Sequence, residues 1–160
     1  MTIQRNTSPL FGVRVGLCWF TGLPVKKTNV PMEMITVEHL VAKRSKYFNL
    51  FLHKRENLVI CSGAVNQIIG NAPFFLKLTF RARIIKFMKS HDVITRDDLK
   101  TIWKRMIVNY CFLSPRGNLI PVWEFRVHQV DEIPLDILEM LCKIERNEKK
   151  AISEFFKVSL

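Results

Sequence analysis

The stretch FFLKLTFRARIIKFMK, residues 74–89, governs the predicted fold because apolar and basic positions alternate along it. From Phe74 to Ile84, every second residue is apolar, whereas the intervening positions include Lys77, Arg81 and Arg83. A period of two is typical of a β-strand that buries one face. We therefore predict a strand over residues 74–85, with three cations and no anion on its outer face.

Positive charge is concentrated in the first part of the chain, whose net charge is +11 overall. Residues 1–91 contain fourteen Lys and Arg against three Asp and Glu, which gives +11, whereas residues 92–160 contain eleven of each sign. Solvated surfaces usually mix both signs, and an excess of one sign destabilises a compact fold by self-repulsion. The asymmetry therefore predicts an anionic partner, either a nucleic acid such as RNA or the headgroups of an anionic membrane surface.

Most cations of the first part are candidates for contact with that partner. They belong to the 74–89 stretch, to a loop with two adjacent lysines, and to the segment around residues 43–55. Each cation near an anionic leaflet contributes about 1 kcal/mol, so several must act together. The predicted contact residues are Lys26, Lys27, Lys43, Arg44, Lys46, Lys54, Arg55, Lys77, Arg81, Arg83, Lys86 and Lys89.

The segments before the 74–89 stretch are predicted to be mainly extended. Residues 11–20 alternate as a half-buried strand, and residues 21–32 form a long loop with two prolines. The LPV sequence of that loop, beside two lysines, either packs as an ordinary loop or inserts into a membrane surface. Residues 35–46 fit a short helix or a strand. Residues 46–63 resemble a hairpin with HKREN at its turn.

The second part of the chain contains the clearest helix and a second hairpin. Thr95 and Asp98 form a capping box at the start of a helix over residues 95–110, which has an apolar stripe at helical spacing. PRGN, residues 115–118, is a strong turn sequence between two apolar segments. Pro121 places the later segment at a sheet edge or at the start of a strand. A C-terminal helix follows Pro134, and its RNEKK sequence is a possible break into two helices.

These elements predict one α+β domain over residues 1–160, with a short flexible segment at residues 1–8. Strand–helix alternation is too poor for a doubly wound parallel sheet, so we expect a mostly antiparallel sheet with helices packed on one side. Self-association into a homo-oligomer or polymer is expected through apolar edges at Pro121, Phe155 or Phe156, although the two phenylalanines also fit a buried core.

No motif for catalysis, metal binding or cofactor binding occurs in the sequence. The chain lacks GxGxxG, GxxxxGK[ST], GxSxG and HExxH, and its four cysteines form no CxxC pair. No apolar run approaches the ~20 residues needed to span a bilayer. We therefore expect a protein that is not an enzyme, has no metal or cofactor, and meets a membrane only peripherally.

The chain resembles the small matrix proteins of negative-strand RNA viruses, in particular the plant rhabdovirus kind. The resemblance concerns FFLKLTFRA, TRDDLKTIWKRM, and a later strand with Trp123 before an amphipathic C-terminal helix. A basic N-terminal tail and the PPxY and PTAP motifs are absent, which departs from the pattern of many such proteins. The resemblance implies a virion protein of the host cytoplasm or nucleus, without enzymatic activity. It would self-associate, bind nucleocapsid and contact an anionic membrane.

A soluble RNA-binding accessory protein, such as a silencing suppressor or a replication factor, is the alternative hypothesis. Such a protein would bind RNA without lipid and remain a discrete small oligomer. A matrix protein would instead polymerise as the salt concentration falls. RNA contact by either protein should depend strongly on salt, because the sequence lacks residues arranged to recognise base edges.

Overall fold

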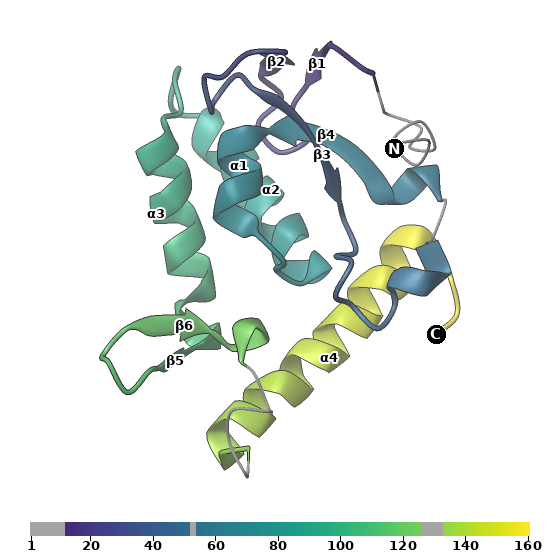
Figure 1. Cartoon of the computed structure of the whole chain (residues 1–160), viewed down its shortest axis with the longest axis vertical. Coiled ribbons are helices and arrows are strands. Elements are labelled where there is room, and N and C mark those ends of the chain that lie inside the picture. The colour runs from purple at the N-terminus through teal and green to yellow at the C-terminus, as the bar shows by residue number, and fades with distance from the viewer. Residues whose placement is uncertain (1–11, 52–53, 126–132) are drawn as a thin grey trace, which may run out of the picture.

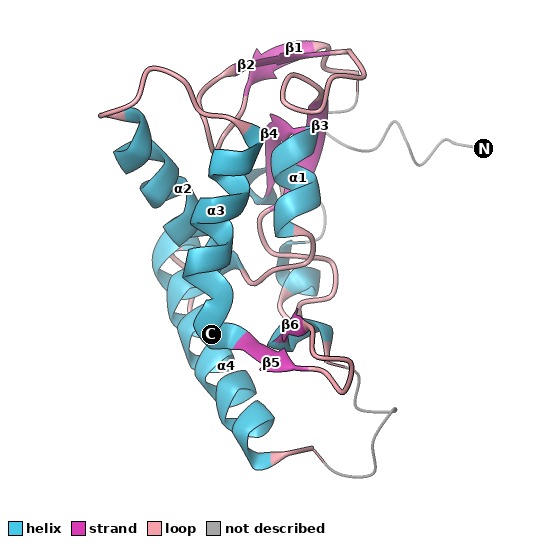
Figure 2. Ribbon diagram, turned by 90° about the vertical axis from the view of Figure 1, so that its left-hand side faces the viewer, coloured by secondary structure: helices cyan, strands magenta, loops and turns pink. Residues whose placement is uncertain are grey.

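The computed structural model describes residues 12–51, 54–125 and 133–160, so the predicted flexible segment 1–8 lies outside the described residues. Helices α2, α3 and α4 lie on one side of the molecule, whereas β3, β4 and α1 lie on the other (Figures 1 and 2). In chain order the strands and α-helices are β1 (Val15–Leu17), β2 (Pro24–Lys26), β3 (Ile35–His39), β4 (Leu58–Ser62), α1 (Gly63–Ile69), α2 (Phe74–Met88), α3 (Arg96–Ile107), β5 (Cys111–Leu113), β6 (Leu119–Pro121) and α4 (Leu135–Phe156).

The α+β class is confirmed, with 49% helix and 16% strand in one compact domain. The strands pair as β1–β2, β3–β4 and β5–β6, and each pair is antiparallel. The described strands thus form three separate two-stranded sheets rather than one continuous sheet. An isolated parallel bridge between Lys26 and Met34 connects the first two sheets.

The strand predicted over residues 74–85 is wrong, because this stretch forms the helix α2. Leu76, Phe80 and Ile84 recur every four residues and are all buried on one face of α2. The helix also separates the three cations that the predicted strand placed on one face. Lys77 is buried and Arg81 is half-buried, whereas Arg83 is exposed. Successive helical residues turn by about 100°, so positions two apart point in different directions.

The two helices predicted in the second part of the chain are present. Thr95 and Asp98 form the expected capping box at the start of α3: the Thr95 side chain accepts from the Asp98 backbone, and the Asp98 carboxylate accepts from the Thr95 backbone. The C-terminal helix α4 is continuous over 22 residues and is not broken at RNEKK. The capping box and the helical periodicity, both local features of the sequence, thus predict these two helices correctly.

The predicted hairpins agree with the structure only in part. Residues 35–39 of the ambiguous segment form β3, which pairs with β4, so the predicted pairing within residues 46–63 is wrong. The predicted first arm contains a 3₁₀ turn, Phe48–Phe51, instead of a strand. The PRGN hairpin is confirmed as β5–β6, with Gly117 at a φ of 86° in its turn. Trp123, expected on a strand, lies in a 3₁₀ turn.

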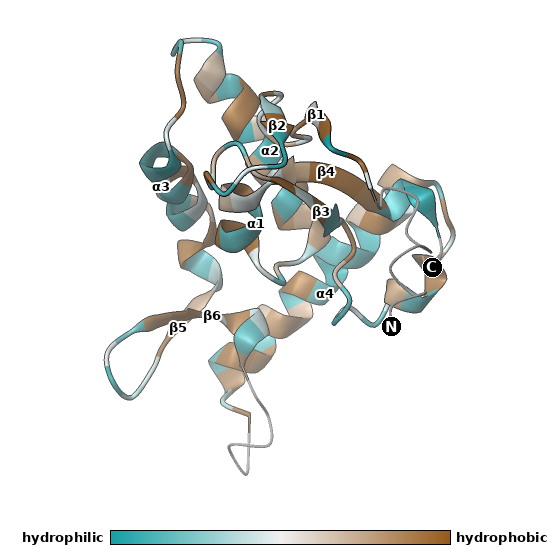
Figure 3. Ribbon diagram, turned by 45° about the horizontal axis from the view of Figure 1, so that its top comes forward, coloured by the Kyte–Doolittle hydropathy of each residue, from teal (hydrophilic) through white to brown (hydrophobic). Residues whose placement is uncertain are grey.

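The apolar core connects α2 to every layer of the fold. Phe80, Leu99 and Trp103 belong to the largest buried cluster, and the Phe80 and Trp103 rings lie 5.0 Å apart between centroids. Phe74, at the start of α2, belongs to a second cluster with Ile152 of α4. In Figure 3, β4 is coloured as hydrophobic, whereas α2 carries both hydrophobic and hydrophilic residues. In the described residues, no helix is both long and apolar enough to cross a bilayer.

Candidate functional site

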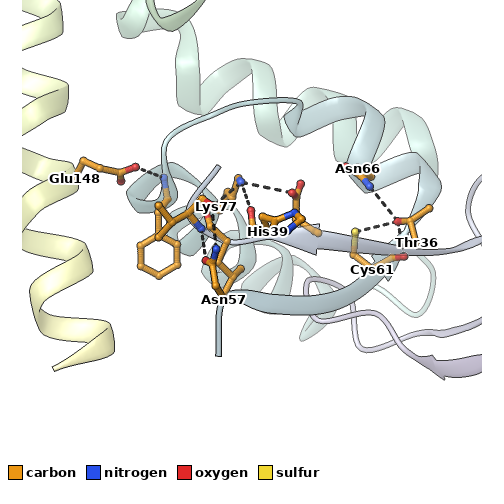
Figure 4. A network of polar contacts seen from close by, with 11 residues as sticks. Thr36, His39, Asn57, Cys61, Asn66, Lys77 and Glu148 are labelled. Atoms are coloured by element: carbon orange, nitrogen blue, oxygen red, sulfur yellow. Dashed lines mark hydrogen bonds and ion pairs between the residues drawn. The ribbon is translucent and has the colours of Figure 1, made fainter. Parts of the chain in front are cut away.

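Lys77 was predicted to face an anionic partner, and this placement is corrected by the structure. Its side chain is 0% exposed, and its ammonium group donates to the carbonyls of His39 at 2.8 Å and Leu40 at 3.1 Å (Figure 4). The Glu38 carboxylate lies 3.8 Å from the same ammonium group. Burial lowers the pKa of Lys77 and raises the pKa of Glu38, because both charged forms lose hydration. Lys77 therefore joins α2 to the end of β3 and cannot reach a partner.

Glu148 of α4 anchors the start of the same helix. Pro73 precedes α2 and has no side chain that can cap it. The Glu148 carboxylate instead accepts a hydrogen bond from the backbone N–H group of Phe74 at 2.8 Å (Figure 4), and a second one from that of Phe75 at 2.9 Å. A carboxylate at this position satisfies free N–H groups and complements the positive end of the helix dipole. Burial nevertheless raises the pKa of Glu148.

Arg81 has a structural role on the next turn of α2. Its Nε donates to the Trp19 carbonyl at 2.8 Å, and its guanidinium group lies 4.3 Å from the centroid of the Trp19 ring. A planar guanidinium over an indole is a favourable cation–π arrangement. Arg81 thus fixes the end of the β1–β2 hairpin against α2, and its charge is only partly free for a partner.

Two further predicted contact residues form ion pairs with carboxylates from the second part of the chain. Arg44 lies 3.5 Å from Glu124, and Lys46 lies 2.6 Å from Glu145. The Tyr47 hydroxyl also hydrogen-bonds to Glu145. These pairs are solvent-exposed, so each adds little to stability, but each reduces the positive field at its position.

Ten of the twelve predicted contact residues are exposed, and eight of these ten have no carboxylate within 4.0 Å in the described part of the chain. The eight come from separate elements: β2 and the residue after it, the connection that follows β3, the 3₁₀ turn Arg55–Asn57 with the residue before it, and the second half of α2 with the residue after it. The eight are Lys26, Lys27, Lys43, Lys54, Arg55, Arg83, Lys86 and Lys89.

The β1–β2 hairpin combines exposed cations with an exposed apolar face. In its register, Val15 lies opposite Lys26 and Leu17 lies opposite Pro24. The side chains of these four residues share one face, because alternate residues of paired strands point to the same side. Val15 is 71% exposed and Leu17 is 64% exposed. We call this surface, formed by Val15, Leu17, Pro24 and Lys26, the hairpin face.

Packing on the opposite side of the hairpin explains why the apolar row points outward. Gly16 and Val25 face inward, and Val25 is buried in the main core. A Cβ atom added at Gly16 would lie only 3.0 Å from the Ile60 side chain, so glycine allows the hairpin to lie close to β4. The Val25 side chain consequently cannot insert into a membrane, whereas Pro24 is exposed.

The residues predicted for self-association differ in their exposure. Phe156 is half-buried, and its ring centroid lies 4.4 Å from that of Phe51 in the core. Phe155 is partly exposed beside it. Pro121 ends β6 and is half-buried. Of the three, Phe155 is the most exposed, at 43%.

A cavity of about 170 Å³ lies between the segment after β3, the start of α2 and α4. Its two carboxylates are already engaged, since Glu145 pairs with Lys46 and Glu148 accepts from the N–H groups of α2. In the described residues, no group of three or more His, Cys, Asp or Glu could hold a metal ion. Both carboxylates of this cavity are thus held in contacts within the fold.

The chain matches no protein-family model, no curated protein and no solved structure.

The contact surface predicted from the sequence did not include Val15 and Leu17 of the hairpin face, or Arg14 beside it. Arg14 is exposed, and its carbonyl accepts from the Lys27 backbone N–H at 3.2 Å, which brings the two basic residues to the same end of the hairpin. The sequence does contain one relevant feature. Glycine at position 16, between two apolar residues, is typical of a strand face that lies close to another backbone.

Proposed function

We propose that the protein is a non-enzymatic structural protein of the matrix type that binds an anionic membrane surface through the hairpin face. The observation that supports this best is the placement of Val15 and Leu17 on one exposed face with Lys26. Apolar side chains enter the boundary between headgroups and acyl chains, whereas cations remain at the level of the lipid phosphates.

The magnitudes are consistent with weak, reversible membrane association. Lys26 lies on the hairpin face, whereas Arg14 and Lys27 are exposed at the neighbouring positions of the same hairpin end. Each cation would contribute up to about 1 kcal/mol near an anionic leaflet. Burial of Val15 and Leu17 would contribute about 1.5–3 kcal/mol for each side chain. Neither contribution is large enough alone after the cost of association, so binding should require both anionic lipid and the apolar side chains.

The remaining exposed cations supply a second anionic contact. Arg83 and Lys86 lie on the second half of α2 and Lys89 directly follows it, whereas Lys43, Lys54 and Arg55 lie on other segments. Because these cations are not part of the hairpin face, they are available to the phosphates of a nucleocapsid while the hairpin contacts lipid. Such contact would be directed at the RNA backbone, and would weaken as salt is added.

Co-sedimentation with vesicles tests the proposal. Wild-type protein should sediment with phosphatidylserine–phosphatidylcholine vesicles and not with phosphatidylcholine alone, and Leu17→Asp should abolish this binding. Leu135→Asp is the matched control, because Leu135 is 69% exposed on the first turn of α4, far from the hairpin (Figure 1). Unchanged binding by Leu17→Asp would reject the hairpin face. Binding to RNA without binding to vesicles would favour the alternative of a soluble RNA-binding protein.

A further inference from the structure

The β5–β6 hairpin has a second exposed apolar face. Leu113 lies opposite Leu119, and these side chains are 67% and 60% exposed. Cys111 and Pro121 lie opposite each other on the same face, nearer the body of the protein. The other face of the hairpin packs inward, where Phe112 contacts the cluster formed by Val122, Ile137 and Ile144. Cys111 packs against the main core, so the exposed part of this face is the leucine pair.

This face differs from the hairpin face of β1–β2 because it contains no charged residue. Its four positions are leucine, leucine, cysteine and proline, and Arg116 lies on the connecting turn. The surface therefore lacks the several cations that membrane association requires. An apolar surface without charge suits another apolar surface of the same kind.

The location of this face favours a second copy of the chain as its partner. Two copies that each have a net charge of +11 repel each other, so a contact is least unfavourable where the net positive charge is smallest. The β5–β6 hairpin belongs to residues 92–160, whose net charge is zero. In Figure 1 this hairpin lies below the middle of the molecule, away from β1–β2 at the top.

We propose that the β5–β6 faces of two copies pack against each other in a symmetric, end-to-end pair. Contact between identical surfaces is the usual arrangement of a two-fold dimer. The pair would place its two β1–β2 hairpins at the outer ends. It would therefore link two anionic surfaces, a consequence that depends on the membrane-binding function proposed above.

Salt should affect the two interactions in opposite directions. The dimer contact is apolar, and added salt screens the repulsion between basic copies, so the dimer should persist or strengthen at high salt. Binding to anionic vesicles should weaken under the same conditions. The opposite responses separate dimer formation from membrane binding.

The test combines sedimentation equilibrium with vesicle clustering measured by light scattering. Wild-type protein should be dimeric at high salt, and Leu113→Asp/Leu119→Asp should weaken the dimer by at least about tenfold. At low salt the wild type should cluster phosphatidylserine-containing vesicles, whereas this variant should still co-sediment with vesicles without clustering them. Leu50→Asp is the control for an exposed leucine elsewhere, and circular dichroism checks that each variant is folded.

The outcomes distinguish the two proposals. A variant that remains dimeric, or a wild type that is monomeric at all concentrations, would overturn the end-to-end pair even if vesicle binding occurs. A wild-type dimer that depends on Leu113 and Leu119 but ignores vesicles would support the pair and reject the membrane function.

Discussion

The carboxylate of Glu148, on α4, accepts a 2.8 Å hydrogen bond from the backbone N–H of Phe74, the first residue of α2. These residues are 74 positions apart in the chain, and Phe75 donates to the same carboxylate. The contact joins the C-terminal helix to the helix that supports Lys77 and Arg81. It therefore contributes to the position of α2, the helix on which Lys77 and Arg81 face inward.

Loss of this carboxylate should destabilise the whole domain. Glu148→Ala leaves two N–H groups at a buried helix end without their acceptor, and we expect the free energy of unfolding to fall by about 2 kcal/mol. Urea denaturation followed by circular dichroism measures the change. Glu154→Ala, at an exposed position of the same helix, should change stability little. Equal losses for the two variants would contradict the proposed anchoring of α2.

Lys77 and Glu38 should show strong energetic coupling. Lys77→Met leaves the Glu38 carboxylate buried without its cation, and breaking a buried pair in this way costs about 3–5 kcal/mol. In Lys77→Met/Glu38→Gln the uncompensated charge is absent, so the double variant should be more stable than the sum of the single effects by about 1–2 kcal/mol. A double-mutant cycle from urea denaturation measures the coupling. Additive effects would show that the two charges do not interact.

The pH dependence of stability should reveal the raised pKa of Glu38. Burial raises the pKa of Glu38 above its ordinary value of 4.5. Between pH 4.5 and the raised pKa, the folded protein therefore binds more protons than the unfolded chain does. The contribution of Glu38 to stability therefore increases as the pH falls from 7 toward 4.5, and decreases as the pH rises. Glu38→Gln lacks this contribution. The stability of wild type relative to Glu38→Gln should increase over that range, and a constant difference would contradict the raised pKa.

Local sequence patterns were sufficient where a structure depends on neighbouring residues. The capping box of Thr95 and Asp98 lies within four residues, and PRGN contains its own turn chemistry, so α3 and the β5–β6 hairpin followed directly. Helix α2 did not follow. Its stretch fits both a period of two and the four-residue spacing of Leu76, Phe80 and Ile84, and its N-terminal acceptor is the distant Glu148.

The candidate surface was predictable only in part, for a related reason. Alternation in residues 11–20 separates two rows of side chains but does not determine which row faces the core. That choice depends on the packing of Val25 inside and on the close approach of Gly16 to Ile60, both of which require the tertiary structure. Charge counting likewise found an excess of cations, but it could not show that Lys77 is buried.

The exposed cations should contribute unequally to membrane binding. Lys26→Glu/Lys27→Glu reverses charge at the hairpin, and should abolish co-sedimentation with anionic vesicles at physiological salt. Lys54→Glu/Arg55→Glu makes the same change in net charge on a different segment. It should weaken vesicle binding far less and should weaken RNA binding instead. Equal losses from both pairs would indicate that net charge, rather than the hairpin, determines membrane binding.

An environment-sensitive fluorophore on the hairpin tests the central claim most directly. Leu17→Cys in a Cys142→Ser background provides an exposed thiol for labelling, and Leu135→Cys in the same background provides the control. On addition of phosphatidylserine-containing vesicles, the label at position 17 should shift its emission to the blue and be quenched by lipid-attached quenchers, while the label at position 135 should not change. A label at position 17 that remains in water while the protein is bound to vesicles would contradict membrane contact through the hairpin face.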